Sequence, residues 1–256
     1  YHQEPMSYDA LLHWCRTQAE KFAPYICDVS AYLQQASNAG KRIVLEAQLG
    51  AMRDIDYGIF PFTSSSNTLA AYAPLGADIP NVKLDHVVGV LKAYSTCVGA
   101  GPFAAEKAMP ENWMQALRKA GGEFGAATGR PRRVGPFDCV ASRYGLACQG
   151  ADKIALTKLD VLSGMKEIPV ITGYTLNGAP VTAFDPTDDQ DRMEPVVTML
   201  PGWDCDISRC NRYEDLPDAA KNYIEFLEKQ LVHTIQFIST GAAREQYLLK
   251  GAWLTA

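Results

Sequence analysis

The sequence lacks the long apolar runs and the short catalytic signatures that identify many protein classes. No stretch approaches the roughly 18 consecutive apolar residues of a transmembrane helix. The opening YHQEPMSYDALLHW has neither the basic start nor the apolar stretch of a secretory signal. The patterns HExxH, GxSxG and GxxxxGK[ST] are all missing. We therefore expect no metalloprotease centre, no hydrolase triad and no P-loop within these 256 residues.

Positive charge is also scarce. The chain has 24 Lys and Arg against 29 Asp and Glu, which gives a net charge of -5 and a pI near 5.4. General nucleic-acid binders usually present a basic face, so we expect no nucleic-acid partner and, without an apolar span, no membrane partner. Small anionic ligands remain compatible with this charge, because they need only a local cationic cluster.

Cysteine occurs seven times but never as CxxC, and no His lies near the closest pair, Cys205 and Cys210. The pattern predicts free, buried thiols in a reducing compartment, not a disulfide framework or a zinc site. Hydrophobic residues make up 47% and charged residues 21%, as in ordinary globular proteins. The length suffices for a buried core.

Helix-like and strand-like segments alternate along the chain. This order predicts an α/β fold with a mostly parallel central sheet flanked by helices. An Asn-Gly pair predicts an antiparallel hairpin, near 168–184, as an addition to that sheet. We expect residues 1–256 to form a single domain. The expected helices are 7–23, 110–122, 137–149 and 216–231, and the expected strands are 42–47, 86–96, 153–160 and 234–239.

Three polar segments follow predicted strands, where open α/β sheets bind their ligands. One follows 42–47, and the others are Thr157–Asp160 and Ser239–Gly241. A fixed Asp160 carboxylate accepts two hydrogen bonds from the ring N–H and exocyclic amine of guanine, which adenine does not offer. The Lys158 stem can lie along the base. The small residues of Ser239–Gly241 allow a flat base or sugar to pack closely. The alternative for Thr157–Asp160 is a solvated strand end.

Two further segments carry polar groups suited to anions. Residues 125–133 hold three Arg within four positions beside two Gly, and guanidinium groups bind carboxylates and phosphates bidentately. The alternative is a charged surface turn. Residues 63–67 form a hydroxyl-rich loop suited to phosphate or sugar oxygens. Before it, Asp54 and Asp56 either hold a metal or, more commonly, cap a turn.

Eight strings occur in a fixed order: DIDYGIFPFTSSSNT, KAYSTCVGAGPF, GGEFGAATGRPRR, ALTKLDVLSG, LPGW, RYEDLP, NYI and ISTG. From about residue 5 to about residue 250 the chain resembles the adenylosuccinate synthetase family. The resemblance implies a cytoplasmic, homodimeric ligase of purine biosynthesis that uses Mg2+ and GTP. In that reaction GTP phosphorylates the 6-oxygen of IMP, and the amine of L-aspartate displaces the phosphate to give adenylosuccinate.

The resemblance also implies binding residues, matched position by position. No catalytic residue and no metal ligand is expected in this chain. The residues implied for GTP are Arg132, Lys158, Leu159, Asp160, Ser239, Thr240 and Gly241; for IMP, Gln48, Leu49, Ser64 and Arg130; and for aspartate, Ala126, Ala127, Thr128, Gly129, Arg130, Pro131 and Arg132.

The chain departs from the family pattern on the IMP and aspartate side. Leu49 stands at the position of a family Gln, although a local shift allows Gln48 to serve instead. Ala127 replaces a Thr, and Cys97 replaces an Arg. The family's GDEGKGK loop, general-base Asp and phosphoryl-stabilising His have no counterpart here. We expect them, with the Mg2+ ligands, in an N-terminal portion absent from this chain, which alone is expected to be inactive.

Two other functions remain open at this point. One is a divergent ligase that acts on another purine nucleotide or amine donor, which Leu49 and Ala127 would permit. The other is a non-catalytic homologue that binds guanine nucleotides and has lost the chemistry.

Overall fold

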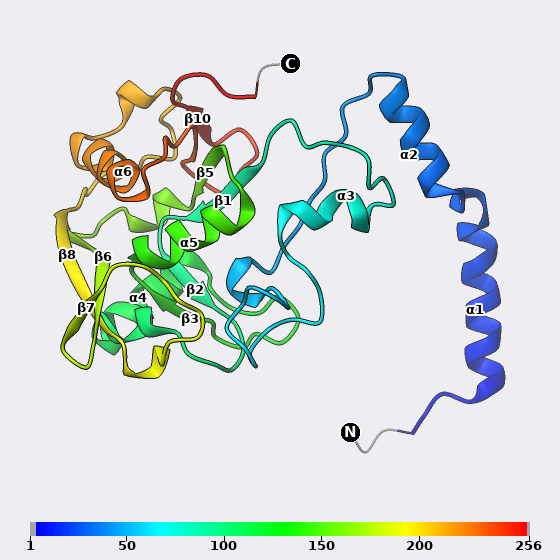
Figure 1. Ribbon diagram of the computed structural model, residues 1–256, viewed down its shortest axis with the longest axis horizontal. Helices are drawn as coiled ribbons and strands as arrows, with labels where there is room; N and C mark the ends of the chain where they lie inside the picture. The colour runs from blue at the N-terminus through cyan, green and yellow to red at the C-terminus, as the bar shows by residue number, and fades with distance from the viewer. Residues whose placement is uncertain (1–3, 255–256) are drawn as a thin grey trace. The chain divides into compact units, whose positions relative to one another are not determined.

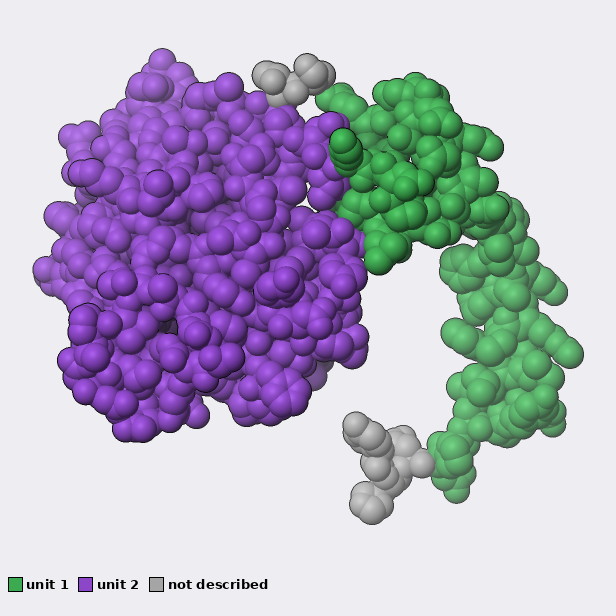
Figure 2. All heavy atoms as spheres, viewed as in Figure 1, with its two compact units in different colours: residues 1–46, 73–83 green, residues 47–72, 84–256 purple. Residues whose placement is uncertain are grey.

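The computed structural model describes residues 4–254. Its contacts divide the chain into two compact units, drawn in green and purple in Figure 2. Unit 1 comprises residues 1–46 and 73–83, and unit 2 comprises residues 47–72 and 84–256. A division by contacts does not say whether each unit folds independently. The single domain expected over 1–256 therefore stays a prediction.

Unit 1 contains short helices with side-chain caps. The Ser7 hydroxyl accepts from the backbone N–H of Ala10 at 3.3 Å, and Asp28 caps the second helix in the same way. Neither of the two capped helices buries a residue, and Trp14 on the first of them is 55% exposed. The helices are α1 (Tyr8–Phe22), η1 (Ala23–Tyr25), α2 (Val29–Asn38) and α3 (Ala73–Gly76).

The strand expected over 42–47 does not form, which corrects the prediction. The segment has no regular secondary structure, and Val44 is 90% exposed. A short apolar run becomes a strand only where a neighbouring strand supplies backbone partners, and none pairs with this run in the described chain. Only two of the three polar segments therefore follow a strand.

The first sheet of unit 2 has the order β1-β5-β9-β10. The first three strands are parallel, and β10 is antiparallel to β9. The carboxyl ends of β1, β5 and β9 therefore meet at one edge. In Figure 1 helix α5 lies across β1, which it contacts. The strands are β1 (Val88–Lys92), β5 (Lys153–Thr157), β9 (Phe237–Ser239) and β10 (Tyr247–Leu249).

Three helices close the main core of unit 2. Asp138 caps α5 by accepting two backbone N–H groups, and Gly122 and Gly150 end α4 and α5 at φ 61°. The core gathers fully buried side chains from the first sheet and from α6, among them Leu156 and Tyr223. The helices are α4 (Glu111–Gly121), α5 (Cys139–Gln149) and α6 (Asp218–Leu231).

The remaining strands form a mixed sheet and a two-stranded sheet. Strand β6 is parallel to β4 and antiparallel to β7 and β8, and β2 is antiparallel to β3. Asn177 and Gly178 turn β6 into β7 at φ 53° and 81°, so the hairpin is confirmed. The strands are β2 (Ser95–Cys97), β3 (Arg133–Gly135), β4 (Phe137–Asp138), β6 (Glu167–Leu176), β7 (Ala179–Val181) and β8 (Glu194–Pro201).

The α/β class is confirmed, whereas the sheets are mixed and not one mostly parallel sheet. The four expected helices form within a few residues of their predicted bounds. The segment 86–96 splits into β1 and the start of β2, and the strand expected over 153–160 ends at Thr157 because Lys158 adopts φ 60°. The described part of unit 2 also contains six 3-10 helices: η2 (Ala51–Arg53), η3 (Ala70–Tyr72), η4 (Ala104–Lys107), η5 (Leu159–Leu162), η6 (Gln190–Arg192) and η7 (Tyr213–Asp215).

The cysteines are free, as expected, but mostly not buried. Cys139 alone is buried in the described chain, and burial raises the pKa of its thiol to about 12. Cys15, Cys27 and Cys205 are exposed.

Candidate functional site

The first part of the site lies where β5 ends. Lys158 turns the chain at φ 60°, and Leu159 is fully buried, which anchors the turn in the core. Asp160 follows in a half-buried position, and burial raises the pKa of its carboxyl group. Its carboxylate forms no ion pair within residues 4–254. A carboxylate in this state gains from accepting N–H groups of a ligand.

The second part lies at the end of β9, the neighbour of β5. The Ser239 hydroxyl donates to the Gly241 carbonyl oxygen at 2.9 Å, and the Thr240 N–H donates to the Gln246 carbonyl oxygen at 2.9 Å. The Thr240 side chain is fully buried, yet its hydroxyl has no hydrogen-bond partner in the described chain. Because η5 contacts β9, the structure brings both predicted guanine-side segments together.

The arginine-rich loop is a hairpin with an exposed tip. Its base is closed by the Arg132 N–H, which donates to the Glu123 carbonyl oxygen at 2.9 Å. The Gly125 N–H donates to the Arg130 carbonyl oxygen at 2.8 Å, and Gly129 turns the tip at φ 64°. Residues 126–131 are exposed, which includes all members predicted to bind aspartate except Arg132. The Thr128 hydroxyl accepts the Arg130 N–H at 3.3 Å.

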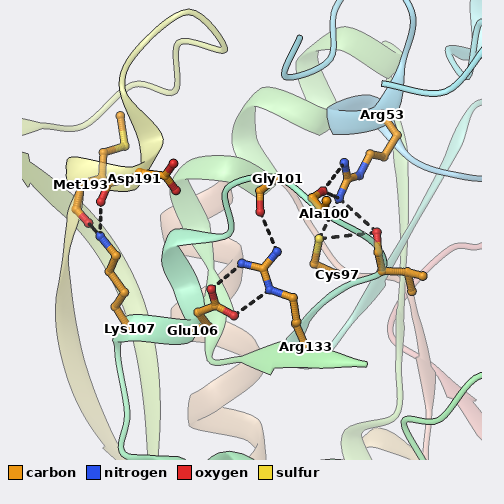
Figure 3. Close-up of polar contacts among 10 residues, drawn as sticks. Arg53, Cys97, Ala100, Gly101, Glu106, Lys107, Arg133, Asp191 and Met193 are labelled. Carbon is orange, nitrogen blue, oxygen red and sulfur yellow. Dashed lines mark hydrogen bonds and ion pairs between the residues drawn. The ribbon is translucent and has the colours of Figure 1, made fainter. Parts of the chain in front are cut away.

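The three arginines have different surroundings. Arg130 is exposed, and its side chain makes no ion pair with any described residue. Arg132 donates to the Glu123 carboxylate at 2.8 Å. Arg133 is ion-paired with Glu106 and donates to the Gly101 carbonyl oxygen at 2.6 Å (Figure 3). Arg132 and Arg133 are thus both ion-paired, and Arg130 is the arginine of this loop that has no ion pair within residues 4–254. The anion-binding role of the loop stays a prediction.

A fully buried carboxylate, Glu123, contacts both Arg132 of the hairpin and Lys158 after β5, and it was not predicted from the sequence. It accepts from Lys92 Nζ at 2.9 Å, from Tyr94 Oη at 2.6 Å and from Arg132 at 2.8 Å, and Lys158 Nζ lies 3.7 Å away. Burial alone would raise the pKa of Glu123, but the hydrogen bonds from Tyr94, Lys92 and Arg132 lower it to about 2. Its only sequence signal is its place within the quoted GGEF string.

The predicted IMP side is more open. Gln48 and Leu49 are exposed, and Leu49 adopts φ 76°. No hydrogen bond joins either of them to Ser64 among the described residues, and the Ser64 hydroxyl donates to the Ser66 carbonyl oxygen at 3.0 Å. Asp54 is buried and accepts three backbone N–H groups. It therefore caps a turn, and the metal alternative for this aspartate is not supported.

Arg53 ties the Ser64 segment to the glycine-containing loop 97–101. Figure 3 shows its guanidinium beside Cys97 and Ala100 of that loop. Its guanidinium donates to the carbonyl oxygens of Phe62 and Ala100, and to that of Val98 at 3.1 Å. It also lies 2.9 Å from the Cys97 sulfur. The Ser64 N–H in turn donates to the Arg53 carbonyl oxygen at 2.7 Å.

Within residues 4–254, no three His, Cys, Asp or Glu side chains gather at one place. Mg2+ commonly needs only one or two carboxylates together with the phosphates of a nucleotide, so the position of its ligands stays a prediction. No described helix is long and apolar enough to cross a membrane.

Comparisons with known proteins agree over nearly the whole chain. The sequence model of a family described as adenylosuccinate synthetase matches residues 1–248. The chain is 41% identical over 255 residues to the adenylosuccinate synthetase of Thermomicrobium roseum and 40% identical over 250 residues to that of Frankia alni. These matches cover 98% and 97% of this chain but 58% of each relative.

A solved structure extends the likeness to three dimensions. It is that of a fully ligated adenylosuccinate synthetase from Plasmodium falciparum, with a TM-score of 0.88 and 34% sequence identity. The match covers 96% of this chain and 59% of the solved one. The chain therefore spans a little under three fifths of the length of the proteins it matches.

Proposed function

The chain belongs to the adenylosuccinate synthetase family, and from that premise we propose that it provides the guanine-nucleotide and aspartate sites of a GTP-dependent ligase. The ligase joins IMP and L-aspartate to give adenylosuccinate, a step of purine biosynthesis. The observation that carries this proposal is the half-buried Asp160 carboxylate at the joint edge of β5 and β9. A carboxylate placed there pairs with the two adjacent N–H donors of guanine.

On the guanine side, Asp160 selects the base by accepting from its ring N–H and its exocyclic amine. The Lys158 ammonium donates to the Gly121 carbonyl oxygen at 2.6 Å, which leaves the Lys158 stem to lie along the base. Ser239, Thr240 and Gly241 form the other wall. The unpartnered Thr240 hydroxyl supports this assignment, because a buried hydroxyl without a partner is costly until a ligand satisfies it. The Leu159 side chain is fully buried, so only the backbone of this residue can contact the guanine nucleotide.

On the aspartate side, the exposed hairpin tip of residues 126–131 surrounds the amino acid, and Thr128 and Arg130 hold its carboxylates. The guanidinium of Arg130 suits bidentate pairing with a carboxylate. Ala127 offers no hydroxyl, and one missing hydrogen bond of this kind weakens binding by about 0.5–1.5 kcal/mol. Arg132 faces both the aspartate and GTP.

IMP is bound by Ser64, through its phosphate, and by Arg130, with Gln48 and Leu49 beside it. GTP transfers its terminal phosphoryl group to the 6-oxygen of IMP. The aspartate amine then forms the new C–N bond while the C–O bond breaks, and the 6-oxygen leaves within inorganic phosphate. The general base and the Mg2+ ligands are not assigned to this chain.

The enzyme acts as a cytoplasmic homodimer.

Oxygen-18 at position 6 of IMP tests the reaction. Because this chain alone is expected to be inactive, the full-length gene product is purified and incubated with Mg2+, labelled IMP, GTP and L-aspartate, and the phosphate is analysed by mass spectrometry. We expect one labelled oxygen per phosphate released and one adenylosuccinate per GTP consumed. Unlabelled phosphate, or GTP hydrolysis without adenylosuccinate, would contradict the proposed reaction. Omitting aspartate is the control.

The second candidate is a ligase for another purine nucleotide or amine donor. Leu49 favours this second candidate. It is exposed, and its aliphatic side chain cannot donate a hydrogen bond to a purine as a glutamine side chain would. The same phosphate-release assay, run over a panel of purine nucleotides and amino acids, separates the two functions. A preference for any pair other than IMP and aspartate supports the second. GDP binding without phosphate release for any pair supports the non-catalytic homologue.

A further inference from the structure

Two proposed ligand sites of this protein meet at one buried carboxylate. The Glu123 side chain is fully buried between Lys158, which follows β5, and Arg132, which follows the hairpin loop. One carboxylate oxygen, Oε1, lies 3.7 Å from Lys158 Nζ, and the other, Oε2, accepts from Arg132 at 2.8 Å. No hydrogen bond among the described residues joins Arg132 directly to Lys158. The Glu123 carboxylate is therefore the side-chain group that contacts both cations. A longer route also joins them, because Lys158 donates to the Gly121 carbonyl oxygen at the end of α4, and Arg118 on α4 donates to the Arg132 carbonyl oxygen at 2.8 Å.

The surroundings of Glu123 leave it little freedom to move. Tyr94 and Lys92 donate to the same oxygen, at 2.6 and 2.9 Å. Behind them, a Cβ atom added at Gly121 would lie 2.3 Å from Tyr94 Oη. The packing therefore holds the tyrosine hydroxyl against the carboxylate, and the carboxylate fixes the cations around it.

The charge balance of this cluster points toward an anion. One carboxylate is shared by three cations, Lys92, Arg132 and Lys158, whose side chains are 28%, 33% and 39% exposed while Glu123 is not exposed at all. The nearby Asp160 carboxylate interacts with Lys158, so three cations stand against two carboxylates and one positive charge remains in surplus on the exposed side of the cluster. Phosphate and carboxylate groups are the ligands that such a surplus attracts.

We propose that Glu123 is a positioning residue that couples the guanine side of the site to its anion side. It fixes Lys158 and Arg132 relative to each other, so displacing one cation changes how the other meets its ligand. The inference rests on the proposed function, since it assumes that both cations face a guanine nucleotide. It adds a residue and a coupling that neither the motifs nor the comparisons assign.

A double-mutant cycle on GDP binding tests this coupling. GDP dissociation constants are measured by calorimetry for the full-length gene product with Mg2+, for its Arg132→Gln and Lys158→Met variants and for the double variant. The same cycle is repeated in the Glu123→Gln background. We expect the two substitutions to be non-additive by at least threefold when Glu123 is present. Their effects should multiply, within experimental error, in the Glu123→Gln background.

A merely structural role for Glu123 would lower affinity without changing this additivity. Glu106→Gln is the matched control, because it removes a carboxylate from the neighbouring Arg133 pair, which lies outside the proposed ligand contacts. We expect that variant to retain both GDP affinity and coupling. If Glu123→Gln does not fold, Tyr94→Phe removes one donor to the carboxylate and should reduce the coupling.

The outcomes separate the inference from the proposed function. GDP binding by the unchanged protein with equal coupling in the presence and absence of Glu123 would overturn the inference alone. So would an additive cycle in the unchanged protein. Failure of the folded, unchanged protein to bind GDP would instead refute the proposed function. Threefold or greater coupling that disappears with Glu123→Gln supports both.

Discussion

Lowering the pH should remove the part of the folding free energy that comes from the ionised Glu123 carboxylate. Its pKa is about 2 in the folded protein, against an ordinary value of 4.5 for a glutamate outside this structure. A group whose pKa is lower in the folded state stabilises the fold above the unfolded pKa and loses that contribution as the pH falls. The pKa difference corresponds to a contribution on the order of 3 kcal/mol at neutral pH.

Part of that contribution, on the order of 1 kcal/mol, should be lost between pH 7 and pH 3.5, because the unfolded chain binds the proton there and the folded one does not. Urea unfolding at a series of pH values, for the unchanged protein and for Glu123→Gln, isolates this contribution. Other carboxylates titrate alike in both proteins and cancel in the difference. The stability gap between the two should therefore narrow as the pH falls.

A gap that stays constant from pH 7 to 3.5, or widens, would refute this reasoning. Glu106→Gln is again the matched acid-to-amide control. The Glu106 side chain is 38% exposed, and ion pairs of that exposure contribute only about 0–1 kcal/mol. We expect its stability difference from the unchanged protein to stay small at every pH.

The other predictions concern the packing around Gly121, the loop 97–101 and the Asp160 carboxylate. Gly121→Ala should destabilise the protein by about 1–3 kcal/mol in urea unfolding, because its Cβ would overlap Tyr94 Oη; unchanged stability would contradict it. Arg53→Leu should raise hydrogen exchange of loop 97–101, whose carbonyl oxygens the guanidinium binds; unchanged exchange would show that the loop holds itself. GDP affinity should fall as the pH is lowered toward the raised pKa of Asp160, because protonation removes the charge of the carboxylate that accepts from guanine. Calorimetry that shows stronger GDP binding at acidic pH would contradict this role of Asp160.

The helices were predictable because their signals are local. Gly122 and Gly150 end α4 and α5 in the left-handed conformation that glycine adopts most easily. The strand expected over 42–47 was wrong because a strand needs a partner strand, and none pairs with this segment in the described chain. Parallel pairing of β5 with β9 does bring Asp160 and Thr240 to one edge, as the strand-end argument predicted.

Glu123 was not predicted because its importance comes from distant residues. Lys92 and Tyr94 lie 31 and 29 positions away in the sequence, and only the fold brings them to the carboxylate. The cysteines show the same limit. Sequence composition predicts buried thiols, yet Cys15 lies on α1, which buries no side chain, and Cys27 is exposed between η1 and α2.

The measurement that tests the central claim most directly is base selectivity before and after Asp160→Asn. Calorimetry compares GDP, ADP and xanthosine diphosphate, whose base has a carbonyl oxygen in place of guanine's exocyclic amine. The unchanged protein should prefer GDP. Losing charge-assisted hydrogen bonds worth about 1.5–3 kcal/mol should weaken GDP binding by roughly ten- to hundredfold. The asparagine amide should strengthen binding of xanthosine diphosphate, because its N–H group donates to the new carbonyl oxygen. Equal affinity for GDP and ADP, or an unchanged preference after Asp160→Asn, would contradict the claim that Asp160 recognises guanine.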